Sequence, residues 1–119
     1  MFPASQLARL FVKGSLKNTV HGFEMKLKNI IDSGTLVGLG PLVVDDIQYA
    51  PGAFTVKTGE TEMRADQITR TTPFPIRSFV ETLITVEGTP LTPGLHKLGF
   101  LLFTREVGRI QFNLTEPLS

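Results

Sequence analysis

Cysteine and tryptophan are absent from this 119-residue sequence, and tyrosine occurs only once. Without thiols there is no disulfide, no thiolate nucleophile and no cysteine-bound metal or iron–sulfur cluster, so stability must come from a buried core. With a single tyrosine, a platform on which sugars or bases stack is not expected. The lack of cysteine suits a reducing compartment, and the first residues show no basic stretch followed by an apolar one. We therefore expect a cytoplasmic protein.

Long apolar runs and a strong charge of one sign are missing too. No run approaches the roughly 20 apolar residues of a membrane helix, so no membrane partner is expected. The net charge is only +1, which argues against a nucleic-acid partner held through many phosphates. Basic side chains nevertheless predominate in residues 1–31 and acidic ones in residues 32–66. Either neighbouring strands of opposite charge pair across an exposed sheet face, or the basic face holds an acidic ligand.

The segments that are present are short, β-like and regularly spaced. Glycine, proline and Asp/Asn turn signals recur about every 8 to 12 residues, a spacing typical of a sandwich or barrel. Apolar and polar residues alternate cleanly over residues 22–28 and again over residues 109–114. We therefore predict one domain over residues 1–119, an all-β antiparallel sandwich of about seven to nine strands.

Two segments depart from this pattern. Residues 5–11 would form a short amphipathic helix capped by Ser5, or else an extended arm. Residues 66–75 contain Pro73 and Pro75, which restrict the backbone without providing sheet partners. This second segment is expected to be irregular and mobile.

Candidate catalytic groups are sparse. The two histidines, His21 and His96, are far apart, and a metal site would require them to converge with Asp32, Asp45 or Asp46, which nothing in the spacing demands. Asp45 and Asp46 suit either paired carboxylates or a turn, and adjacent residues of a strand face opposite ways, which favours the turn. No serine lies in the context of a nucleophile elbow. We therefore expect no catalytic residue, no metal and no cofactor.

A basic strand face is the alternative candidate for function. Its members are Lys17, Asn18, His21, Lys26 and Lys28. Ammonium and amide groups of this kind suit an acidic or sugar-like ligand. On this hypothesis the chain is a ligand-binding module.

The most apolar segment is residues 95–104, which predicts a strand with apolar side chains on both faces. A small sandwich covers only one face of a sheet with its own second sheet. The other face would be covered by residues 2–11 or by another subunit, and we favour the subunit. The predicted interface residues are Leu98, Phe100, Leu101 and Phe103. The leading hypothesis is thus a noncatalytic accessory or assembly subunit, either a homo-oligomer or the partner of a larger enzyme.

Four short stretches occur in an order that resembles a known family. They are residues 14–18, 22–24, 43–46 and 91–96. Together they resemble the small β-subunit of bacterial C-glycoside deglycosidases. The resemblance implies a β-sandwich beside a larger metal-dependent barrel subunit that carries the catalytic groups, so the chain would be an accessory subunit of a carbon-glycoside-cleaving lyase. Asp46 replaces the glycine that this family has in its Val-Asp-Gly turn, and Asp32-Ser33-Gly34 replaces its Tyr-Arg-Gly stretch.

Overall fold

The chain folds into two packed antiparallel β-sheets. A computed structural model describes residues 7–30 and 33–119. In the first sheet the strand order is β1 (Lys17–Thr19), β2 (Gly22–Lys28), β9 (Glu81–Glu87), β6 (Phe54–Thr58) and β7 (Thr61–Arg64). In the second the order is β5 (Ile47–Tyr49), β4 (Leu42–Val44), β10 (Leu95–Thr104), β3 (Gly34–Leu39) and β8 (Phe74–Ile76), with β11 (Gly108–Pro117) also paired to β10. The predicted antiparallel sandwich is confirmed.

The described residues form eleven strands, more than the seven to nine predicted. Two of the additional strands, β1 and β8, have only three residues each, too few for alternation to be visible in the sequence. Another arises where Gly40 and Pro41 divide one apolar stretch into β3 and β4. Both pieces pair with β10, β4 near its beginning and β3 near its end.

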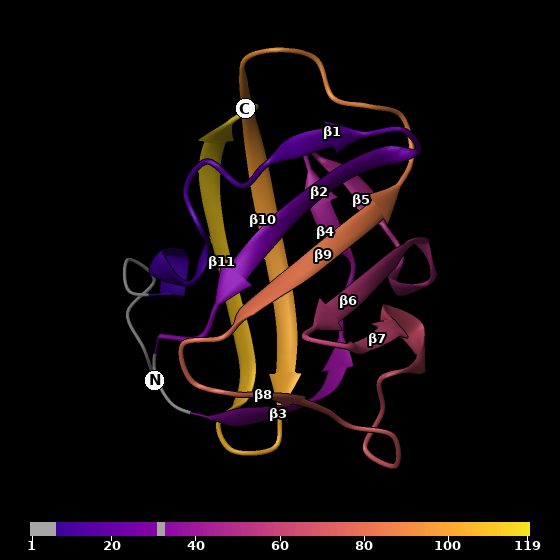
Figure 1. Ribbon diagram of the computed structural model, residues 1–119, viewed down its shortest axis with the longest axis vertical. Helices are drawn as coiled ribbons and strands as arrows, with labels where there is room; N and C mark the ends of the chain where they lie inside the picture. The colour runs from indigo at the N-terminus through magenta and orange to yellow at the C-terminus, as the bar shows by residue number, and fades with distance from the viewer. Residues whose placement is uncertain (1–6, 31–32) are drawn as a thin grey trace.

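The core lies between the sheets, where β10 and β11 run along the long axis and β2 and β9 cross them (Figure 1). The predicted alternation of β2 is confirmed over its first five residues, because Phe23 and Met25 are fully buried while Glu24 and Lys26 between and after them stay partly exposed. In the second sheet the Phe112 ring of β11 stacks on Phe100 of β10 at 5.0 Å between centroids. Alternation therefore correctly identified the inner faces of these strands.

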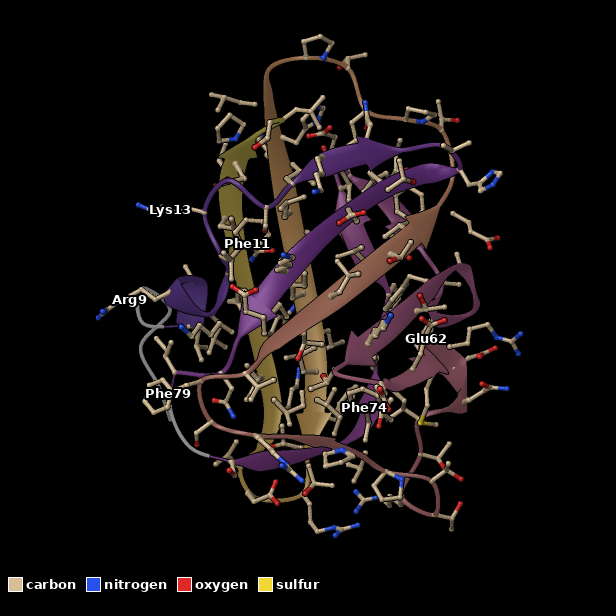
Figure 2. All side chains as sticks on the ribbon, in the orientation of Figure 1. Arg9, Phe11, Lys13, Glu62, Phe74 and Phe79 are labelled. Carbon is tan, nitrogen blue, oxygen red and sulfur yellow. The ribbon has the colours of Figure 1, made fainter. Side chains whose placement is uncertain are left out.

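The N-terminal segment packs onto this core. The described part of the predicted helix over residues 5–11 is a single 3-10 turn, η1 (Ala8–Leu10), while Ser5 lies outside the described residues. Phe11 (Figure 2) then forms an isolated bridge to Leu27, and its ring centroid lies 6.2 Å from that of Phe100. Two further 3-10 turns are η2 (Pro51–Ala53) and η3 (Ala65–Gln67). None of the helical turns in the described residues is long and apolar enough to cross a membrane.

The expectation that residues 66–75 lack sheet partners is wrong for Phe74 and Pro75, which pair with β3. Strand β8 starts at Phe74, whose side chain is fully buried (Figure 2), and Pro75 is registered opposite Thr35 of β3. Proline is tolerated here because β8 is an edge strand, where a missing N–H breaks no inner ladder. The buried Phe74 ring thus packs the end of a segment that its two prolines had predicted to be irregular and mobile.

Candidate functional site

An ion pair of the second sheet joins a buried histidine to an exposed aspartate, and it ties β10 to a neighbouring turn. Asp45 and Asp46 form the two-residue turn between β4 and β5 with φ of 52° and 69°, which is typical of a type I′ hairpin and confirms the turn interpretation. The ring of His96 is almost fully buried, with Nδ1 2.5 Å from Asp45 Oδ2 and Nε2 2.6 Å from the Thr92 carbonyl oxygen. The Lys97 backbone N–H donates to Asp45 Oδ1 at 2.8 Å.

These hydrogen bonds determine the charge of the pair. Both ring nitrogens of His96 lie within hydrogen-bond distance of an oxygen atom, a geometry that favours the imidazolium form, which donates from both nitrogens. The Asp45 carboxylate, followed by the Thr92 carbonyl, raises the pKa of His96. In return, the hydrogen bonds from His96 and from the Lys97 backbone lower the pKa of Asp45. Neither ring nitrogen is left to act as a base, so the pair is a structural clamp.

The second histidine does not join this pair. His21 is exposed in the turn between β1 and β2 of the first sheet, and its carbonyl oxygen accepts a hydrogen bond from the Gly88 backbone N–H at 3.0 Å. Within residues 7–30 and 33–119, no three His, Cys, Asp or Glu side chains are grouped as metal ligands. Asp32, one of the aspartates that a metal site with the two histidines would need, lies outside the described residues.

The predicted basic face exists on the first sheet, but two of its lysines already have partners. Lys17 Nζ lies 4.0 Å from Glu24 Oε2 across the β1–β2 pair. Lys26 Nζ lies 3.7 Å from Glu81 Oε1 of β9. The charges thus pair across the exposed face, although the acids belong to residues 24 and 81 and not to residues 32–66.

The remaining members of that predicted set differ in role. Asn18 holds a loop, because its amide donates to the Leu91 carbonyl oxygen at 2.9 Å and accepts from the Leu91 N–H at 2.8 Å. Lys28, at the end of β2, is half-buried and makes no ion pair with any described residue. Of the five residues, Lys28 is therefore the one whose charge is open to a ligand.

The predicted interface residues on β10 divide between two faces. Leu98 and Phe100 are 1% and 4% exposed, so their side chains are covered inside the chain, in part by Phe11. Leu101 and Phe103 point to the other side and form the outer face of the second sheet. An interface on this strand can use only these two of the four.

Glycines shape that outer face. A Cβ placed on Gly40 would lie 2.5 Å from Leu101 Cδ2, and one placed on Gly38 would lie 3.5 Å from the Phe103 ring. The two side chains therefore lie across bare backbone. Leu101 becomes half-buried in this way, while Phe103 remains 38% exposed.

A cavity of about 240 Å³ lies between the two sheets. Its apolar wall includes Leu27, Val56 and Ile84 from the first sheet and Leu36, Leu102 and Ile110 from the second. Val56, Leu36 and Ile84 are buried, so the space reaches into the core. Alternating apolar residues predict that two sheets will pack, but they do not show where the packing leaves a gap, which is why sequence reasoning missed this cavity.

The rim of the cavity is polar and carries one charge from each sheet. Lys28 comes from β2, and Glu106 from the turn between β10 and β11. The Glu106 carboxylate accepts hydrogen bonds from the Thr35 backbone N–H at 2.8 Å and from the Thr35 hydroxyl at 3.0 Å. The backbone bond, as the largest cause, lowers the pKa of Glu106. The carboxylate is thus engaged within the chain, whereas the ammonium of Lys28 is not.

Comparison with curated proteins finds no matching sequence. The model of the family described as hydroxymethylglutaryl-CoA reductase, N-terminal domain, matches residues 6–119. This match overturns the resemblance to the small subunit of C-glycoside deglycosidases and, with it, the expected link to a carbon-glycoside-cleaving lyase. The stretches that carried that resemblance are turns and strand ends, such as the Asp45–Asp46 hairpin, which unrelated sandwiches also use. Because the match covers almost the entire sequence, the chain belongs to the family of hydroxymethylglutaryl-CoA reductase N-terminal domains.

Proposed function

We propose that this chain is a noncatalytic module that assembles with a larger enzyme or with a second copy of itself. The family is described as the N-terminal domain of a reductase, that is, as one part of a larger enzyme. This description supports an accessory role. Location in the cytoplasm belongs to the same proposal and is supported by the cysteine-free composition.

The observation that carries the proposal is the outer face of the second sheet. Phe103 projects from β10, which lies between β3 and β11, and packs over Gly38, while Leu101 on the same face packs over Gly40. An exposed aromatic side chain on an outer sheet face is typical of the centre of a protein interface, where such side chains contribute most of the binding energy. The flanking Gln111 and Arg109 of β11 lie opposite these two residues and would form a polar rim.

Light scattering on the purified chain tests the assembly. At micromolar concentration the mass is expected to be at least twice the 13.1 kDa of one chain and to fall on dilution. A soluble monomer across the whole range would remove the main support for self-assembly through this face.

An activity assay tests the noncatalytic part of the proposal separately. The purified chain is expected to give no reduction of hydroxymethylglutaryl-CoA above that of a buffer blank. Turnover that follows the folded chain through chromatography would contradict a noncatalytic module.

A further inference from the structure

We propose that the cavity between the sheets binds an aliphatic carboxylic acid, with its hydrocarbon chain inside the cavity and its carboxylate at Lys28. The proposal is independent of assembly, because the cavity is lined from the inner faces of the sheets whereas Phe103 lies on an outer face. It gives the chain a binding site for a small amphipathic molecule.

Size and lining indicate an apolar occupant. Protein interiors are close-packed and leave few voids larger than a water molecule. A cavity of about 240 Å³ exceeds the roughly 150 Å³ of engineered apolar cavities that already bind benzene. Most of its wall is aliphatic, and the hydroxyl of its buried Thr82 is already within 3.2 Å of the Thr58 hydroxyl. Water would find few partners along such a wall, whereas a hydrocarbon chain needs none.

The charges at the rim indicate the sign of the head group. Lys28 lines the cavity, is half-buried and has no ion-pair partner among the described residues, unlike Lys26 on the same strand. Glu106 opposes it on the rim, but two hydrogen bonds from Thr35 already engage its carboxylate. A ligand carboxylate therefore finds an open cation on the side of the first sheet and none on the other. A long aliphatic chain joined to one carboxylate would make apolar contacts with the cavity wall and an ion pair with this cation.

Three probes of one chain length separate the contributions of body and head. Titration calorimetry of the full chain with decanoate is expected to show one binding site, with the Ile84 and Ile110 methyl signals shifting in NMR. Decanol should bind about fivefold more weakly, since a half-exposed ion pair contributes at most about that factor. Decylamine should bind more weakly still. Failure of decanoate to bind at millimolar concentration, or tighter binding of decylamine, would overturn the proposal.

Two lysines on one strand provide the matched variants. Lys28→Gln is expected to weaken decanoate by about fivefold while leaving decanol unchanged, and Lys26→Gln should change neither. Ile84→Phe should fill the cavity and abolish binding of both probes. The proposal is contradicted if Lys28→Gln leaves decanoate affinity intact, a result that does not depend on whether Ile84→Phe folds.

Discussion

The outer faces of the two sheets are built on different principles. The first sheet presents a charged face, with Lys17 beside Glu24 and Lys26 beside Glu81, and all four side chains are at least partly exposed. The second sheet places Leu101 and Phe103 over glycines, and the ion pair that it makes between His96 and Asp45 has a buried imidazole.

The charged face of the first sheet favours contact with water, whereas the outer face of the second sheet favours contact with another surface. Exposed ion pairs contribute only about 0–1 kcal/mol each, because water screens them and long side chains lose entropy. They keep an exposed sheet face hydrated without requiring a partner. The outer face of the second sheet, where Leu101 and Phe103 lie over Gly40 and Gly38, is called here the glycine-packed face. It depends on the close fit of Leu101 to Gly40, and burial of its exposed Phe103 by another surface would be favourable. We therefore expect substitutions on the second sheet to have the larger effects.

The largest effect is expected in the core beneath the glycine-packed face. Phe112→Ala removes a buried ring that stacks on Phe100, and should lower the free energy of unfolding by about 3–5 kcal/mol through lost burial and a residual cavity. Arg109→Ala on the same strand faces solvent and serves as the control. Urea melts measure both, and equal midpoint shifts would show that the faces of β11 are assigned wrongly.

The ion pair between buried His96 and Asp45 should give the chain a pH-dependent stability. The folded pKa of His96 lies above its ordinary value, so its stabilisation is complete below the unfolded pKa of about 6.5 and is lost as pH rises through the folded pKa. The folded pKa of Asp45 is lowered, so its contribution is present above about 3.9 and is lost as pH falls through the folded pKa. Stability should therefore decline on both sides of this window.

Two histidine variants check that prediction. His96→Gln should cost about 1–3 kcal/mol at pH 6, since an amide cannot donate to both acceptors of the buried ring. It should also remove the decline above pH 6.5. His21→Gln, in an exposed turn of the first sheet, should leave the profile unchanged. An unaltered profile in His96→Gln would assign the pH dependence to another group.

The close packing at Gly40 predicts a loss of stability in the same range as that of His96→Gln. Gly40→Ala would place a Cβ 2.5 Å from Leu101 Cδ2, and overpacking of this kind costs about 1–3 kcal/mol. Gly38→Ala is the control, because its Cβ would meet the Phe103 ring at 3.5 Å, an ordinary contact. If thermal melts show the two variants to be equally stable, Leu101 is not fitted to the backbone as described.

The smallest effect is expected on the charged face. Lys26→Gln breaks the exposed pair with Glu81 and should change the free energy of unfolding by less than about 1 kcal/mol, with the difference disappearing at high salt. Urea melts at low and high salt measure it. A larger loss of unfolding free energy that persists at high salt would mean that the charged face contributes substantially to the stability of the fold.

Periodicity predicted the sandwich and the inner faces of its strands, because alternation directly reports which side chains are buried. It did not reveal β8, since Pro73 and Pro75 conceal the burial of Phe74. The His96–Asp45 pair spans 51 positions of sequence, a separation at which spacing carries no signal without the fold. Composition drew attention to the lysines that lie on β1 and β2 of one sheet, but only geometry shows that Lys17 and Lys26 are paired and that Lys28 lines a cavity.

The most direct test of the difference between the two faces is a matched pair of charge insertions. Phe103→Lys alters the glycine-packed face, and Leu83→Lys alters the charged face, where Leu83 is half-buried opposite Lys26 and Lys57. Sedimentation velocity at micromolar concentration, on variants whose circular dichroism matches the wild type, measures association. We predict that Phe103→Lys is monomeric while Leu83→Lys associates like the wild type. Association retained in Phe103→Lys, or lost in Leu83→Lys, would contradict assembly through the second sheet.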